Sequence, residues 1–112
     1  MENLLSLSFE AHNAERNHHR RYELTIGRDL FGHWTVSVNY GRTGALHGRE
    51  LRYSGTDAEH LRAMIRDRLL RRLSAPKRIG CPYRLAGFSA AAGVDTSFWL
   101  PADIIAQFPV TG

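Results

Sequence analysis

An aromatic residue, a glycine and an arginine follow one another at Tyr40-Gly41-Arg42, where an alternating apolar run ends. A hairpin turn needs glycine but does not need a large ring and a fixed cation beside it. A planar ring can stack on a nucleotide, and a guanidinium can make paired hydrogen bonds with a phosphate. Two structural interpretations stay open: Tyr40 covers the hairpin as a partly buried strand residue, and Arg42 braces loop carbonyl groups or pairs with Glu50.

Positive charge is concentrated around this triplet. The 112 residues include 15 Lys and Arg against 11 Asp and Glu, which gives a formal net charge of +4. Residues 42–84 hold eleven basic and four acidic residues, and no Lys or Arg occurs from Leu85 onward. A basic block of this kind favours a polyanionic partner, nucleic acid first. A solvated surface would account for the same charge without a ligand.

The remaining polar residues predict neither catalysis nor metal binding. Six histidines are present at His12, His18, His19, His33, His47 and His60. None forms a pair with the helical spacing and acidic support typical of zinc sites. No nucleophile elbow, phosphate loop or paired carboxylates are visible. We expect no enzyme activity, no cofactor and no metal.

Cysteine content and hydropathy predict the compartment. Cys81 is the only cysteine, so no internal disulfide can form, which fits a reducing cytoplasm. No signal-peptide pattern opens the sequence. No stretch approaches the roughly 18 apolar residues of a membrane span. We therefore expect a cytoplasmic protein with no membrane partner.

Four strands must position the triplet. Apolar and polar residues alternate over residues 4–13, 21–27, 33–40 and 49–53, which predicts strands with one buried face. The buried positions are Leu5, Leu7, Phe9 and Ala11, then Tyr22, Leu24 and Ile26, then Trp34, Val36, Val38 and Tyr40, and last Leu51 and Tyr53. Residues 14–21 form a polar connection that contains His18 and His19. Residues 41–48 form a glycine-rich hairpin loop.

The apolar period then lengthens to three and four residues. Thr56 followed by Glu59 is a capping-box pattern, and an amphipathic helix is expected over residues 57–74, ended by Pro76. Its polar face carries Arg62, Arg66, Arg68, Arg71 and Arg72, for which a solvated face is the simpler interpretation. Residues 77–85 form a basic turn that leads to a last strand at residues 83–87.

The composition shifts at Phe88. Residues 1–87 are expected to form one domain and residues 88–112 a C-terminal extension. Residues 98–108 are strongly apolar, with Pro101 placed to begin a short helix whose apolar side must be buried. Folding back on the domain is favoured over contact with another chain. Trp34 and Trp99 are expected in the core. The fold class is α+β: a curved antiparallel sheet of four to five strands on one long helix, plus a short C-terminal helix.

The order of these elements around an aromatic-Gly-Arg triplet resembles the WGR domain. NHHRRYELTI resembles the opening of that family's second strand, and DLFGHWTVSVNYGRTG resembles the bacterial form, in which a Phe-Gly turn precedes the triplet. The arginine-rich helix closing near KRIGCPYRL resembles the final basic helix. The resemblance covers residues 4–87. The sequence departs from the family where Tyr40 replaces the leading Trp, and where residues 74–82 separate the helix from Tyr83.

The resemblance implies nucleic-acid binding, because WGR domains of poly(ADP-ribose) polymerases contact DNA at strand breaks. It implies that Tyr40 stacks at a terminus and that Arg42 contacts phosphate or a partner. The predicted nucleic-acid-binding set is Asn17, Arg20, Arg21, Tyr40, Arg42, Arg49, Lys77, Arg78 and Tyr83. We expect non-sequence-specific binding that favours DNA and its ends, by a monomer or weak homodimer. The alternative is a protein-interaction or regulatory module that uses this surface or the apolar extension.

Overall fold

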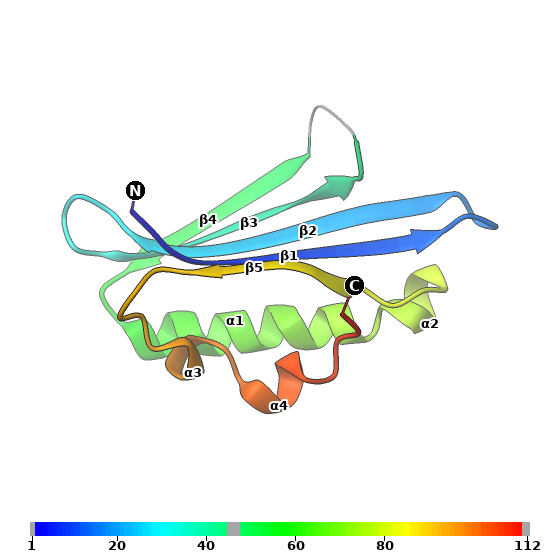
Figure 1. Ribbon diagram of the computed structural model, residues 1–112. Coiled ribbons are helices and arrows are strands. Elements are labelled where there is room, and N and C mark those ends of the chain that lie inside the picture. Colours follow the sequence, from blue (N-terminus) through cyan, green and yellow to red (C-terminus); the bar gives the residue numbers. More distant parts are fainter. Residues whose placement is uncertain (1, 45–47, 111–112) are drawn as a thin grey trace.

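The computed structural model describes residues 2–44 and 48–110, in which five antiparallel strands form one sheet with the helices on one side (Figure 1). The strands are β1 (Glu2–Asn13), β2 (His18–Arg28), β3 (Trp34–Arg42), β4 (Arg49–Gly55) and β5 (Arg84–Ala90), in the spatial order β4-β3-β2-β1-β5. The helices are α1 (Ala58–Leu73), α2 (Ala75–Ile79), α3 (Thr96–Trp99) and α4 (Ala102–Ile105). The predicted α+β class is confirmed.

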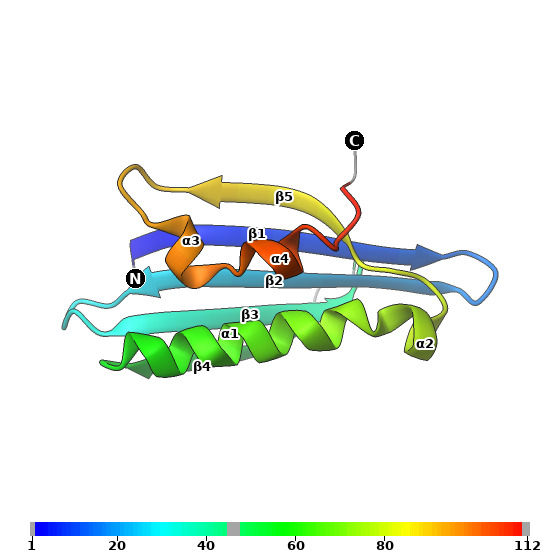
Figure 2. The same cartoon turned by 90° about the horizontal axis from the view of Figure 1, so that it is seen from below.

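The apolar face of the sheet packs on the helical layer. Viewed from below, α1 runs under β3 and β4, while α3 and α4 lie under β1 and β2 (Figure 2). The predicted inward residues of β1 and β2 are buried, from Leu5 to Ala11 and from Tyr22 to Ile26 at alternate positions. Leu61, Ile65 and Leu69 of α1 close the core from the other side. Alternation and helical periodicity therefore identify the same core from both layers.

The strand β2 is longer than predicted at its start. It begins at His18 rather than at Arg21, because the ladder with β1 continues to the Asn13–His18 pair. The chain reverses at Asn17, which adopts φ 54° and donates its N–H to the Ala14 carbonyl. The polar connection is therefore shorter than expected.

The strand β3 also extends further, and this changes the position of the triplet. Gly41 and Arg42 lie within β3 and pair with Arg21 and Arg20 of β2. The prediction that they begin a hairpin loop is wrong, since both continue the ladder. Residues 45–47 of that expected loop, including His47, lie outside the described residues.

The ends of the helix α1 differ slightly from the predicted capping pattern. The N-cap is Asp57 rather than Thr56, and its Oδ1 accepts hydrogen bonds from the N–H groups of Glu59 and His60 at 3.1 and 3.3 Å. A carboxylate at this position satisfies donors that the first turn leaves unpaired and also interacts favourably with the helix dipole. Pro76 does not simply end the helix, because it lies in the first turn of the separate helix α2.

The segment after α2 differs from the predicted basic turn. Gly80, with φ 80°, ends α2 in the left-handed conformation, and β5 begins at Arg84, so Tyr83 precedes the strand. β5 runs to Ala90 and pairs with β1. The predicted last strand is thus present but displaced toward the C-terminus.

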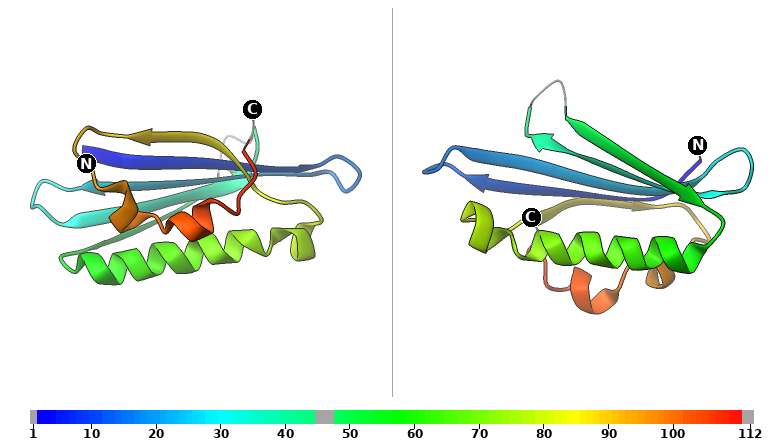
Figure 3. Two further views of the ribbon diagram at one scale, coloured as in Figure 1. Left: turned by 60° about the horizontal axis from the view of Figure 1, so that its bottom comes forward. Right: turned by 180° about the vertical axis from the view of Figure 1, so that it is seen from behind.

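The C-terminal segment folds back under the sheet beside α1 (Figure 3). Trp99, Leu100, Ile104 and Phe108 are buried in the common core. The rings of Phe108 and Phe9 lie 4.7 Å apart between centroids, and Leu85 donates its N–H to the Pro109 carbonyl at 2.7 Å. The expected single helix is two short ones, because Leu100 and Pro101 are extended between α3 and α4. None of the described helices combines the length and apolar character needed to cross a membrane.

Candidate nucleic-acid interface

The fold brings five of the nine predicted binding residues together at one end of the molecule. This is the end where β2 begins, β3 ends and α2 lies beneath the sheet (Figure 1). A shallow pocket of about 190 Å³, called the basic pocket below, is lined by Arg20, Arg21, Tyr40, Gly41, Arg78, Ile79 and Tyr83. The set combines two aromatic rings with three guanidinium groups from β2, β3, α2 and the segment before β5.

The ring of Tyr40 is partly buried, as the structural interpretation of this residue predicts. It lies on the helical side of β3 and stacks on Tyr22 with a centroid distance of 6.3 Å and an interplanar angle of 28°. Tyr22 is buried and its own position is fixed by the core. Tyr40 is therefore held against a rigid support and still lines the basic pocket.

The guanidinium of Arg42 braces the turn between β1 and β2. Its Nη1 donates to the carbonyl oxygen of Asn17 at 3.2 Å, and its Nη2 donates to Asn17 Oδ1 at 3.1 Å. This is the loop-bracing interpretation of Arg42, made with Asn17 rather than with its own hairpin. Within the described part of the chain Arg42 forms no ion pair with Glu50, which pairs with Arg52 at 3.0 Å instead. Neither Asn17 nor Arg42 is among the residues that line the basic pocket.

Arg20 and Arg21 approach the pocket from opposite faces of β2. Arg20 is exposed and lies opposite Arg42 in the ladder. Arg21 packs against Gly48, where a Cβ atom would lie 2.6 Å from Arg21 Nη2 and 2.7 Å from the Tyr40 carbonyl oxygen. Glycine at position 48 therefore lets Arg21 and the start of β4 approach the backbone of Tyr40.

Arg78 connects the pocket to the end of α1. Its Nη2 donates to the Arg71 carbonyl oxygen at 2.6 Å and its Nε donates to Ser74 Oγ at 3.2 Å. This carbonyl oxygen also accepts from the Ser74 N–H and hydroxyl, and a cation at this helix end offsets the helix dipole. The exposed Lys77 and Arg49 are not among the lining residues, although Arg49 lies opposite Tyr40 across the ladder.

Arg72 lies against aromatic rings of the core rather than on the solvated face of α1 that its sequence predicts. Its guanidinium carbon lies 4.4 Å from the ring centroid of Tyr22 and 6.0 Å from that of Tyr83, and its Nε is buried without a hydrogen-bond partner among the described residues. Burial raises the pKa of Tyr22, and the positive charges of Arg72 and Arg68 partly offset this effect. The helical spacing from Ile65 and Leu69 was the signal that could have identified it.

The basic pocket has an unbalanced positive charge. Among the described residues, no carboxylate forms an ion pair with Arg20, Arg21 or Arg78. Ion pairs of the arginines occur elsewhere, on β4 and along α1. The pocket therefore offers cations that remain available to an anionic ligand.

The described histidines do not form a metal-binding cluster. His12 and His19 are cross-strand neighbours with their Nδ1 atoms 3.0 Å apart, and Glu10 lies 3.6 Å from His12 Nε2. His18 and His19 belong to β2 rather than to a loop. Across residues 2–44 and 48–110, no group of three or more His, Cys, Asp or Glu side chains has an arrangement suited to a metal ion.

Comparison with protein families identifies the class. The model of the WGR domain matches residues 5–68, more than half of the chain, and the protein belongs to the WGR family. WGR domains generally bind nucleic acid in relatives of poly(ADP-ribose) polymerases. Searches among curated proteins and among solved structures gave no match. Arg72, α2, Tyr83 and the C-terminal segment lie beyond the matched residues.

Proposed function

We propose that this protein binds nucleic acid through the basic pocket, with DNA and its ends as the favoured ligand. The observation that carries the proposal is that Arg20, Arg21 and Arg78 meet around the partly buried ring of Tyr40. None of the three has a carboxylate partner among residues 2–44 and 48–110. The proposal assigns binding to the chain and no catalytic step.

The size and chemistry of the pocket fit a terminal phosphate and part of its sugar. Its volume of about 190 Å³ is below the range of roughly 300–1,000 Å³ that holds whole small-molecule ligands. Arginine side chains supply phosphate contacts, which give affinity and orientation without reading sequence. The ring of Tyr40 can then pack on a sugar or base face that a continuous duplex covers but an end exposes.

The test is a comparison of blunt duplex, nicked duplex and single-stranded DNA by fluorescence anisotropy over a salt series. We expect Arg20→Gln to reduce the slope of log K against log salt by about one, as for one lost phosphate contact. Arg52→Gln is the matched control, since Arg52 is exposed but paired with Glu50 outside the pocket. Salt-independent binding, or an equal effect of both variants, would contradict the proposal.

A further inference from the structure

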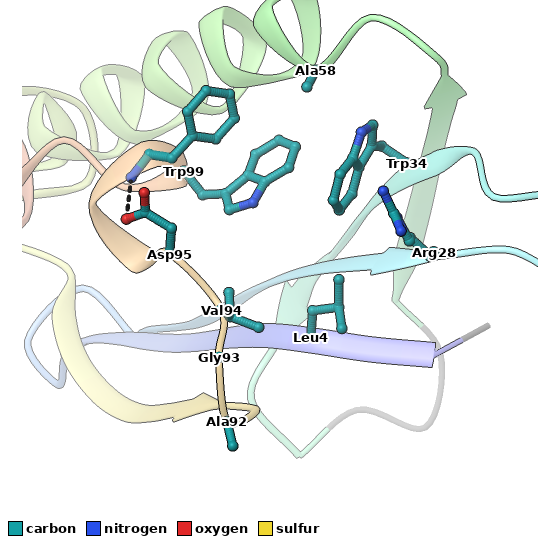
Figure 4. A pocket seen from close by; sticks show the side chains of 10 residues that line it. Leu4, Arg28, Trp34, Ala58, Ala92, Gly93, Val94, Asp95 and Trp99 are labelled. Atoms are coloured by element: carbon teal, nitrogen blue, oxygen red, sulfur yellow. Dashed lines mark hydrogen bonds between the residues drawn. The ribbon is translucent and has the colours of Figure 1, made fainter.

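A pocket larger than the basic pocket lies at the other end of the molecule, where β2 ends and β3 begins. It has a volume of about 510 Å³ and is called the aromatic pocket below (Figure 4). Its walls include Arg28, Trp34, Val94, Asp95, Phe98 and Trp99. It therefore joins the sheet to the C-terminal segment, which lies outside the range matched by the family.

The aromatic pocket is built from fixed rings. Trp34 and Trp99 meet edge to face with centroids 5.0 Å apart, and Phe98 meets Trp99 at the same distance and 89°. The guanidinium of Arg28 lies 4.0 Å from the ring centroid of Trp34. The volume lies within the range of about 300–1,000 Å³ typical of ligand pockets, and an apolar lining with few polar groups is typical of them too. An apolar or aromatic side chain would match this lining in size and chemistry.

Two such side chains project from the adjacent hairpin tip, the turn formed by residues 29–33. Leu30 is 96% exposed and Phe31 is 84% exposed, more than any other large apolar residue described. Contiguous exposed apolar groups are a feature of interaction surfaces, and Leu30 and Phe31 are adjacent in this turn. Because they are so exposed, they do not fill the aromatic pocket of their own chain.

The hairpin tip has a defined conformation. Asp29 Oδ1 accepts hydrogen bonds from the N–H groups of Phe31 and His33, both at 2.9 Å, and Gly32 adopts φ 79°. Slight desolvation acts to raise the pKa of Asp29, but these two hydrogen bonds outweigh it and hold the pKa below its ordinary value. The turn therefore presents Leu30 and Phe31 in a fixed direction beside an ionised carboxylate, which reduces the entropy lost on binding.

The tip and the pocket share one hairpin, and this makes a second copy of the chain the fitting partner. Arg28 and Trp34, which form one wall of the pocket, are the residues on either side of the tip. In a two-fold arrangement each tip can enter the pocket of the other copy, so the same contact forms twice. One pair of charges also matches, because the tip carries the carboxylate of Asp29 and the pocket is lined by the guanidinium of Arg28.

We propose that two copies of this chain associate by reciprocal insertion of Leu30 and Phe31 into the aromatic pocket. The inference does not depend on nucleic-acid binding, because the basic pocket lies at the opposite end.

Sedimentation equilibrium of the full chain from micromolar to millimolar concentration should show a monomer–dimer equilibrium. The double variant Leu30→Ser/Phe31→Ser should weaken it at least tenfold with unchanged thermal stability, since both residues are exposed. Phe88→Ser is the matched control, being 54% exposed but on β5.

A second set of variants tests reciprocity from the pocket side. Ala58 lines the aromatic pocket, and its side chain points into the cavity (Figure 4). Ala58→Trp should fill the pocket and abolish the homodimer. A mixture of this variant with Leu30→Ser/Phe31→Ser should form a heterodimer, in which the intact tip of the first chain enters the open pocket of the second. A mixture of the Phe31→Cys and Ala58→Cys variants should form a disulfide between the two chains on mild oxidation, because the tip of one chain enters the pocket of the other. The native Cys81 is buried and should not compete.

Three results would overturn the inference. A chain that is monomeric at all concentrations does not associate through this surface. A dimer that survives the tip variant uses another interface. A dimer that loses affinity equally with Phe88→Ser depends on general surface apolarity rather than on the tip.

Discussion

At the residue scale, two tyrosines and one arginine connect the core with the basic pocket. Tyr22 lies between Tyr40 on the neighbouring strand and Arg72 on α1, with centroid and guanidinium distances of 6.3 and 4.4 Å. The three side chains come from different elements and are held by one another. Arg72 therefore supports the ring that supports Tyr40, although it does not itself line the basic pocket.

Removal of Arg72 should reduce stability rather than only surface charge. We expect Arg72→Ala to lower the free energy of unfolding by about 2 kcal/mol, because a desolvated cation–π contact and the packing of the side-chain stem are lost. Urea denaturation measures the change. Arg66→Ala is the control on the same helix, since Arg66 is exposed, and should remain within about 0.5 kcal/mol of the parent. Equal losses in the two variants would show that Arg72 is a solvated residue.

Tyr40 offers a test of stacking that separates the ring from its hydroxyl. Tyr40→Ala should weaken binding to blunt duplex DNA by about 5- to 150-fold, which corresponds to the loss of roughly 1–3 kcal/mol of stacking. Tyr40→Phe keeps the ring and should bind nearly as the parent does. Anisotropy titrations at one salt concentration provide the comparison, with circular dichroism to check the fold. If Phe is as damaging as Ala, the hydroxyl rather than the ring makes the contact.

At the element scale, the sequence predicted the sheet and α1 better than the connections between them. Alternation specifies strands wherever one face is buried, as in the run from Leu5 to Ala11. It could not predict that Gly41 and Arg42 stay in β3, because glycine and arginine carry no strand signal and their pairing with β2 is a tertiary contact. Likewise, Pro76 is compatible with both the end of α1 and the first turn of α2.

The candidate site could be predicted only in part, for a related reason. The triplet and the basic block identify the α2 end of the molecule, and five predicted residues do line the basic pocket. The bracing of Asn17 by Arg42 joins residues 25 positions apart, and no local pattern reveals it. Arg72 was misassigned because an arginine on a helix is normally solvated, and only the aromatic rings above it make burial favourable.

The hairpin between β3 and β4 depends on the small size of one residue. Gly48→Ala should destabilise the protein by roughly 1–3 kcal/mol, because the new Cβ would lie 2.7 Å from the Tyr40 carbonyl oxygen and the strand ends must separate. Gly55→Ala, at the other end of β4, meets no atom closer than 4.0 Å and should be nearly neutral. Thermal unfolding of both variants measures the difference. Equal melting temperatures would contradict the close approach of Gly48 to Tyr40.

At the scale of the whole molecule, the C-terminal segment completes the core that the WGR-matched residues begin. The family match ends at residue 68, yet Trp99, Ile104 and Phe108 are buried against strands within it. The sequence indicated that this apolar segment must be covered. It could not specify the partner surface, since the segment's position under β1 and β2 depends on contacts far apart along the chain.

Two adjacent isoleucines provide a direct test of this packing. Ile104 is 1% exposed, whereas Ile105 is only partly buried. Ile104→Ala should lower the free energy of unfolding by about 2–5 kcal/mol, the usual cost of a cavity at a buried aliphatic residue. Ile105→Ala should cost clearly less. A single cooperative urea transition in both proteins would show that the segment unfolds with the sheet, and equal costs would show that α4 is not docked as described.

The length of α1 has a further consequence for the two ends of the molecule. Its 16 residues span about 24 Å, and the molecule is 46 Å along its longest axis. Electrostatic interactions between exposed charges are screened over about 8–10 Å at physiological ionic strength. Salt therefore screens the charges of Arg20 and Arg78 at one end from those of Arg28 and Asp95 at the other. A substitution that changes the charge at one end should therefore leave the electrostatic potential at the other end unchanged.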